Sequence, residues 1–171
     1  LPNSYMVDFT IQASGLQNFF SPSTKTMSIE WKQRARQMEK GYNFEQRYTS
    51  LTYKPVDDSF DYLSETKDAK ETIPEALDWI AFKNQYFSCV FMAEQNFDNA
   101  TLESKMEQQG SGYMKNYTAD MKTAFDPTGA KASHLQFYFG PNHFKTLLAS
   151  NDLSFKDKDQ ELEDLVYLGW P

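Results

Sequence analysis

Hydrophobic and polar residues alternate along positions 5–12, and this period of two predicts a half-buried β-strand. The face expected to be buried carries four side chains: Tyr5, Val7, Phe9 and Ile11. Positions 27–32 repeat the pattern, and positions 134–139 are apolar enough to predict a core strand. Positions 48–53 are rich in Thr and Tyr and are followed by Lys54 and Pro55, which favours a strand at the edge of a sheet.

The strongest apolar signal comes from two neighbouring segments, residues 79–82 and 86–92. Neither segment alternates with polar residues, so both are expected to be buried on two faces. Residues 83–85 lie between them and leave two structures open. Either a tight turn links two strands there, or a bulge kinks one long strand.

Four other segments give weaker patterns. Residues 33–46 are polar and charged and predict at most a short exposed helix, which Gly41 would weaken. Residues 57–75 are highly charged and predict a solvated loop. Residues 100–109 fit either a helix or an exposed strand. Residues 113–125 carry apolar side chains at four-residue spacing, but Met114 interrupts that period.

The clearest helical pattern covers residues 141–150. Pro141 suits the first turn of a helix, where its missing N–H costs nothing, and Phe144, Leu147 and Leu148 follow helical spacing. Just before the core strand, residues 126–129 have Asp, Pro and Gly where a β-turn prefers them. These patterns together predict a mainly β fold with a short helical region near the C-terminal end.

Charge and length narrow the function classes. The chain has 171 residues, which suits one domain, and a formal net charge of −7. An acidic surface repels phosphate, so neither a nucleic acid nor an anionic lipid surface is an expected partner. No apolar run approaches the roughly 18–20 residues that span a bilayer. The one cysteine, Cys89, lies in an apolar run and is expected to be an inert thiol.

The sequence lacks the spacings that metal and catalytic sites require. His134 and His143 flank the predicted core strand, but no HExxH or Cys/His pattern accompanies them. There is no glycine loop for phosphate and no GxSxG nucleophile motif. We therefore expect no metal, no cofactor and no enzymatic activity.

Aromatic residues make up 16% of the chain. Most of these rings are expected to fill the core, because they fall on alternating faces of the predicted strands. The alternative is a carbohydrate- or peptide-binding β-sandwich module, in which some rings line a cleft and stack on the ligand.

Three segments together resemble one protein family. Residues 79–87 (WIAFKNQYF), 137–141 (FYFGP) and 162–170 (LEDLVYLGW) are similar, in this order, to segments of the periplasmic domain of the YidC/Oxa/Alb family of bacterial membrane-protein insertases. The Bacteroidetes branch is the most similar. The positions that carry the resemblance, all with structural roles, are Trp79, Gln85, Phe87, Gly140, Pro141, Gly169 and Trp170.

The resemblance implies a β-supersandwich, related in shape to galactose mutarotases, with a short C-terminal helical region. Residues 1–171 would form a single periplasmic domain fragment, with the β-sandwich in residues 1–160 and a helix near 141–150. Residues 161–171 would be the junction to a membrane domain. The family's domain is longer, so the chain is expected to be its C-terminal portion. The catalytic His and Glu of the mutarotases have no counterparts that we can place here.

The implied function is that of a non-catalytic accessory domain on the periplasmic side of the bacterial inner membrane. It would assist insertion and folding of inner-membrane proteins. The implied partners are translocon subunits or the insertase's own membrane domain, with nascent membrane proteins contacted indirectly.

A candidate contact surface is the predicted sheet edge formed by Arg47, Tyr48, Leu51 and Tyr53, because an open edge can accept a strand. Equally open is the alternative that residues 57–75 cover this edge.

Overall fold

A computed structural model of the chain describes residues 4–21, 23–155 and 159–166. These residues form ten strands and three short helices. The strands are β1 (Met6–Ile11), β2 (Thr26–Arg36), β3 (Ser50–Pro55), β4 (Asp61–Tyr62), β5 (Ala69–Ile73), β6 (Leu77–Lys83), β7 (Phe87–Phe97), β8 (Asn99–Met106), β9 (Tyr113–Ala124) and β10 (Ser133–Pro141). The helices are α1 (Tyr42–Gln46), α2 (Phe144–Asn151) and the 3₁₀ helix η1 (Leu162–Leu165).

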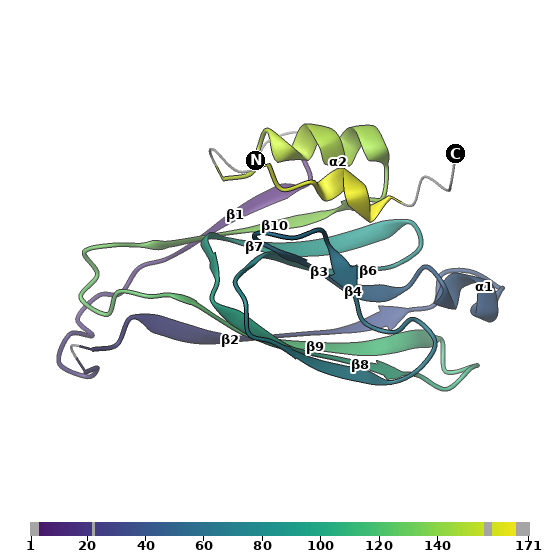
Figure 1. Ribbon diagram of the computed structural model, residues 1–171, viewed down its shortest axis with the longest axis horizontal. Coiled ribbons are helices and arrows are strands. Elements are labelled where there is room, and N and C mark those ends of the chain that lie inside the picture. Colours follow the sequence, from purple (N-terminus) through teal and green to yellow (C-terminus); the bar gives the residue numbers. More distant parts are fainter. Residues whose placement is uncertain (1–3, 22, 156–158, 167–171) are drawn as a thin grey trace.

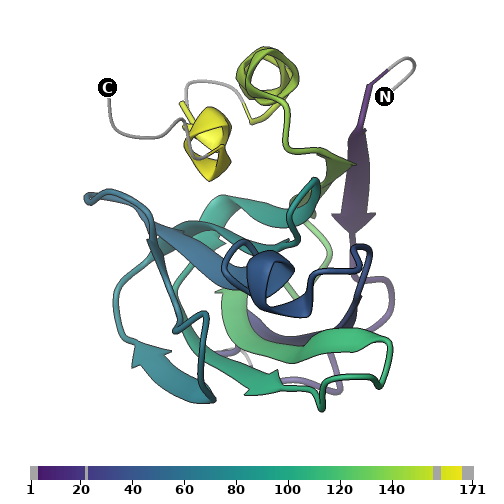
Figure 2. The same cartoon turned by 90° about the vertical axis from the view of Figure 1, so that its right-hand side faces the viewer.

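The strands form two sheets that pack face to face (Figure 1). Sheet A has the order β1-β10-β7-β6-β3-β4, and sheet B has the order β2-β9-β8-β5. Every strand pair between described residues is antiparallel. The end view shows the two sheets stacked, with α2 and η1 forming a further layer on sheet A (Figure 2). The prediction of a mainly β sandwich with a short helix near its end is confirmed.

Aromatic rings fill the space between the sheets. Trp31 of β2 stacks on Phe82 of β6, with ring centroids 3.8 Å apart. Tyr117 of β9 stacks on the same Phe82 ring at 5.0 Å. Phe91 of β7 stacks on Phe137 of β10 at 4.2 Å. Phe137, expected in the core, is only partly buried against it. The aromatic content of these strands therefore serves mainly to join the two sheets.

The outer face of sheet A is buried as well. Its central strands turn Trp79, Val90 and Tyr138 toward α2 and η1, where they form a second apolar cluster. The Trp79 indole N–H donates to the carbonyl of Gln160 at 2.7 Å, just before η1. This double burial explains why β6 and β7 lack alternation, as the sequence predicted. The linking residues form a tight turn, in which the Asn84 amide donates to the Phe87 carbonyl at 2.8 Å.

The first strand is buried differently from our expectation. β1 is an edge strand of sheet A, and its Val7 and Phe9 are 48% and 50% exposed although they lie on the predicted core face. Met6, on the opposite face, is buried in the cluster under α2. The reason is the unequal width of the sheets. Sheet B ends at β2 and leaves the inner face of β1 partly uncovered.

The weakly patterned segments are mostly strands. β2 continues to Arg36, and only five residues of the predicted helix 33–46 form α1. The expected loop 57–75 contains β4 and β5, and the two ambiguous segments after residue 99 are β8 and β9. α2 begins at Phe144 because Pro141 still pairs with Phe87 in β10. The prediction of Pro141 in a first helical turn is therefore wrong.

Candidate functional site

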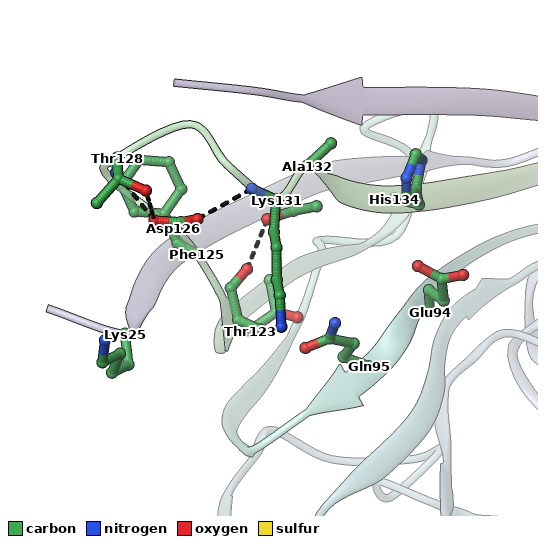
Figure 3. Close-up of a pocket in the computed structure, with 12 residues that line it drawn as sticks. Lys25, Glu94, Gln95, Thr123, Phe125, Asp126, Thr128, Lys131, Ala132 and His134 are labelled. Carbon is green, nitrogen blue, oxygen red and sulfur yellow. Dashed lines mark hydrogen bonds between the residues drawn. The ribbon is translucent and has the colours of Figure 1, made fainter. Parts of the chain in front are cut away.

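One cavity lies at one end of the sandwich and is called the Asp126 pocket below. It has a volume of about 530 Å³ and opens between the β9–β10 connection, the middle of β7 and the start of β2 (Figure 3). Its size falls within the range of small-molecule sites, roughly 300–1,000 Å³. The side chains that line it include Lys25, Glu94, Gln95, Phe125, Lys131 and His134.

One wall of this pocket is a rigid turn built around Asp126. Its carboxylate accepts hydrogen bonds from the Thr128 amide at 2.9 Å, the Thr128 hydroxyl at 2.7 Å and the Lys131 amide at 2.9 Å. These hydrogen bonds, led by the one from the Thr128 hydroxyl, lower the pKa of Asp126. The turn predicted for residues 126–129 is present, since the Gly129 amide donates to the Asp126 carbonyl at 3.1 Å. Asp126 is thus committed to the loop and is a poor ligand-binding acid.

The remaining polar groups of the pocket are available. Among the described residues, the side chains of Glu94, Gln95 and Lys131 make no hydrogen bond or ion pair, and Figure 3 shows them around the opening below His134. Together they offer a carboxylate, an amide and an ammonium group in a lining that also includes Phe125. A lining of unpaired donors and acceptors suits a polar ligand such as a sugar better than an apolar one.

The pocket does not assemble the groups that catalysis needs. His134 Nδ1 lies 3.3 Å from the Thr10 hydroxyl on the exposed sheet surface, and among the described residues no carboxylate hydrogen-bonds to this imidazole. Within the described ranges, no three His, Cys, Asp or Glu side chains are grouped so that they could hold a metal ion. Cys89 is half-buried on β7, and burial raises the pKa of its thiol. Among the described residues, no acid, base and nucleophile converge in the pocket.

The predicted partner edge has a different environment from our expectation. β3 lies between β6 and β4 inside sheet A, so it is not an edge strand. Thr52 and Tyr53 pair with Tyr62 and Asp61, as the alternative in which residues 57–75 cover this strand required. Leu51 and Tyr53 point into the sandwich core and are buried there. Thr and Tyr side chains had indicated an edge, but of the β3 hydroxyl residues only Ser50 and Thr52 face away from that core, whereas Tyr53 is buried in it.

Arg47 and Tyr48 do line a surface cavity, called the β3–η1 pocket below. It has a volume of about 250 Å³. Its lining comes from the turn after α1, from β3, β4 and β6, and from η1: Arg47, Tyr48, Ser50, Thr52, Phe60, Tyr62, Glu65, Lys83, Asp164 and Leu165. Two of the four predicted contact residues thus share one concave surface, and the other two do not reach it.

A buried lysine lies deeper in the sandwich. Lys115 of β9 is 0% exposed, and its ammonium donates to the Thr49 carbonyl at 2.6 Å. Burial lowers the pKa of Lys115 to about 8, and the charge of Glu65 acts in the opposite direction. No sequence pattern indicated that Lys115 is buried, because its neighbour Met114 was the apolar residue.

Among the described residues, the positions that carry the family resemblance lie in strands of sheet A and in one of its turns. Trp79 is fully buried, whereas Phe87 is 54% exposed at the start of β7. Gln85 lies in the β6–β7 turn, where its amide donates to the Tyr86 hydroxyl at 2.9 Å. Gly140 and Pro141 complete β10. The remaining two positions, Gly169 and Trp170, lie outside the described residues.

Gly140 is required by close packing. A Cβ at this position would lie 2.5 Å from the Tyr138 ring, which crosses over Gly140. The Tyr138 hydroxyl then donates to the Pro141 carbonyl at 2.7 Å. The missing side chain at Gly140 thereby lets the Tyr138 ring pack at the end of the apolar cluster on the outer face of sheet A.

Sequence reasoning missed both pockets. The Asp126 turn was recognised, but Lys25, Glu94 and His134 come from distant parts of the chain that only the fold brings together. The unpatterned stretch 57–65 supplies three side chains to the β3–η1 pocket: Phe60, Tyr62 and Glu65. Its two aromatic rings among charged residues were the one available signal.

Comparisons with known proteins all identify the same family. A family model described as the YidC periplasmic domain matches residues 1–171. The membrane protein insertase YidC of Phocaeicola vulgatus is 68% identical over 171 residues, and that of Bacteroides fragilis is 52% identical over 170 residues. The YidC of Porphyromonas gingivalis is 36% identical over 171 residues. The matches cover 100%, 99% and 99% of this chain, but the chain spans only 28%, 27% and 27% of those relatives' lengths.

Proposed function

The chain belongs to the YidC periplasmic domain family, and on this basis we propose that it is a non-catalytic accessory domain of a membrane-protein insertase. It assists the insertion and folding of inner-membrane proteins through contacts with translocon subunits or with the insertase's own membrane domain. Nascent membrane proteins are affected indirectly. The observation that carries the proposal is the family match over the whole chain.

The structure supports a binding role in two ways. It offers concave surfaces at two places on the sandwich, and it brings no catalytic constellation together in the described ranges. No helix among the described residues is long and apolar enough to cross a membrane. A domain of this kind acts by contact, and its surface residues decide the partner.

Site-specific photo-cross-linking in the full-length insertase tests the proposed contact. A photoreactive amino acid replaces Arg47 or Tyr48, and Lys122 on the exposed face of β9 is the control position. We expect cross-links to a translocon subunit or to the insertase's membrane domain from positions 47 and 48, and none from position 122. Equal yields at all three positions, or no adduct at any, would contradict a contact at this surface.

A second candidate function is a carbohydrate- or peptide-binding module. The Asp126 pocket favours it, because the pocket has the size of a ligand site and a lining that combines unpaired polar groups with Phe125. Isothermal titration with neutral oligosaccharides and with unfolded peptides tests this function. Binding that the substitution Gln95→Ala weakens about three- to tenfold would support it, since a hydrogen bond contributes about 0.5–1.5 kcal/mol. Silence in both ligand sets would exclude it.

A further inference from the structure

The β3–η1 pocket has a floor of hydrogen-bond donors. Ser50 of β3 pairs directly with Lys83 of β6, so both side chains lie on the outer face of sheet A. The Ser50 and Thr52 hydroxyl oxygens are 3.2 Å apart. Two hydroxyl groups carry two hydrogens, and the bond between them uses one. One hydroxyl hydrogen is therefore left for a ligand.

Lys83 is the charged group of this floor. Among the described residues, its ammonium forms no hydrogen bond and no ion pair. Burial lowers the pKa of Lys83, and the charge of Glu65 partly offsets this effect without a direct contact. Arg47 adds a second cation at the mouth, and its exposed guanidinium is likewise unpaired among the described side chains.

The walls of the pocket restrict what kind of anion fits. Phe60, Tyr62 and Leu165 offer apolar surface to the body of a ligand. Glu65 and Asp164 face the same cavity, and burial is the main cause that raises the pKa of each. Their negative charge disfavours a doubly charged phosphate more strongly than a single carboxylate. A volume of about 250 Å³ is suited to one side chain rather than to a large ligand.

We propose that the β3–η1 pocket receives an acidic side chain of a partner polypeptide, whose carboxylate binds the Lys83 ammonium and a β3 hydroxyl while Arg47 closes the mouth. This inference rests on the proposed role in protein–protein contacts and names the chemistry of the contact. The carboxylate supplies an anionic partner for the Lys83 ammonium, and an apolar neighbour of the acidic residue lies against Phe60 and Tyr62. Competition from Glu65 keeps the contact weak and reversible.

The test is a titration of the isotope-labelled 171-residue chain with capped dipeptides, followed by NMR. Acetyl-Phe-Glu-amide is the probe, and acetyl-Phe-Gln-amide is its uncharged control. We expect saturable shifts at residues 47–52, 60–65, 83 and 164–165, with the Glu peptide binding at least about fivefold more tightly, as a charge-assisted contact predicts. No shifts, or equal affinity for the two peptides, would overturn the proposal.

Two substitutions with opposite expected effects on the affinity for the Glu peptide extend the test. Lys83→Met removes the proposed cation and should abolish the preference for the Glu peptide. Glu65→Gln removes the competing anion and should tighten binding of the Glu peptide about two- to threefold. Lys122→Met is the matched control on the exposed face of β9 and should change nothing. A preference that survives Lys83→Met, or a stronger response to acetyl-Phe-Lys-amide, would overturn the proposal.

The cross-linking experiment and the peptide titration test the two proposals separately. Cross-links from positions 47 and 48 without any peptide selectivity would remove the carboxylate site and leave the accessory role in place. Peptide selectivity without cross-links would support the carboxylate site and remove the proposed partner contact.

Discussion

Replacing Lys115 tests the electrostatics of the core most directly. Its ammonium is fully buried and donates to the Thr49 carbonyl, and burial lowers its pKa from 10.5 to about 8. The substitution Lys115→Met keeps a side chain of similar length and removes the titrating group. The folded state then no longer contains a lysine that prefers to be neutral.

The sign of the effect follows from the lowered pKa. Between pH 8 and pH 10.5 the unfolded chain holds a proton that the folded chain has released, so the wild type gains stability as pH rises. Below pH 8 both states are protonated, and the full cost of burying the charge is present. With a shift of about 2.5 pKa units, and about 1.4 kcal/mol per unit, the wild type gains about 2.5 kcal/mol between pH 7 and pH 10. Lys115→Met lacks this gain.

At pH 7 the substitution has two opposing effects. It removes the cost of the buried ammonium, and it leaves the Thr49 carbonyl without its donor, which costs about 1–3 kcal/mol. The variant is therefore expected to be close to the wild type in stability at pH 7 and clearly less stable at pH 10. The tyrosines with raised pKa values titrate in both proteins, so their contribution largely cancels in the difference.

Urea denaturation followed by tryptophan fluorescence at pH 7, 8, 9 and 10, at constant ionic strength, measures this difference. Lys122→Met is the control, because Lys122 lies on the exposed face of the same strand. Its stability should stay parallel to that of the wild type. A Lys115→Met difference that is constant within about 0.5 kcal/mol across the range would refute the reasoning, because it would mean that Lys115 keeps an ordinary pKa in the fold.

Three further predictions concern packing and reactivity. Trp79→Ala should cost about 3–5 kcal/mol in denaturant melting, because it empties the centre of the outer cluster and removes the hydrogen bond to Gln160; a loss below about 1 kcal/mol would show that the helical layer contributes little. Gly140→Ala should cost about 1–3 kcal/mol, because the new methyl group meets the Tyr138 ring, whereas Gly41→Ala, with its nearest contact at 3.7 Å, is the control and should be milder. The Cys89 thiol should react with a disulfide reagent at pH 8 more slowly in the native chain than in urea, because burial raises its pKa; equal rates would contradict that burial.

The sequence predicted β6 and β7 correctly, because one cause, burial on both faces, determines their composition. β6 and β7 are continuously apolar because both faces of sheet A are covered, and this was readable from their composition. The family resemblance, read from short motifs in order, is confirmed by the match over the whole chain. The sandwich prediction therefore rested on local signals that the fold also uses.

Other elements depended on contacts that composition does not reveal. The register between β2 and β9 shifts after Ala35, which pairs with Lys115, while Arg36 pairs with Tyr113. Met114 is the extra residue of this bulge, and it is buried beside Lys115. The bulge explains why the apolar period of that segment was blurred. A local shift in register cannot be read from a single sequence.

The candidate sites were the least predictable part. The hydroxyls of β3 indicated an edge strand, although they lie on the floor of a pocket that η1 and β4 complete. Polar side chains on a strand look the same in a sequence whether water or a cavity faces them. Only the pairing of β3 with β4 and β6 distinguishes the two cases.

The pairing of β1 with β10 has a consequence for the timing of folding. Met6 pairs with Tyr138, and β2 pairs with β9, so the earliest strands wait for the latest ones. While the chain is being synthesised, β1 has no pairing strand until β10 is complete, and Met6 has no core to enter. Such long-range pairing slows folding and leaves apolar segments exposed to other chains for longer. A chaperone that shields β1 and β2 until β9 and β10 are complete would therefore raise the yield of folded domain more than one that binds the strands between them.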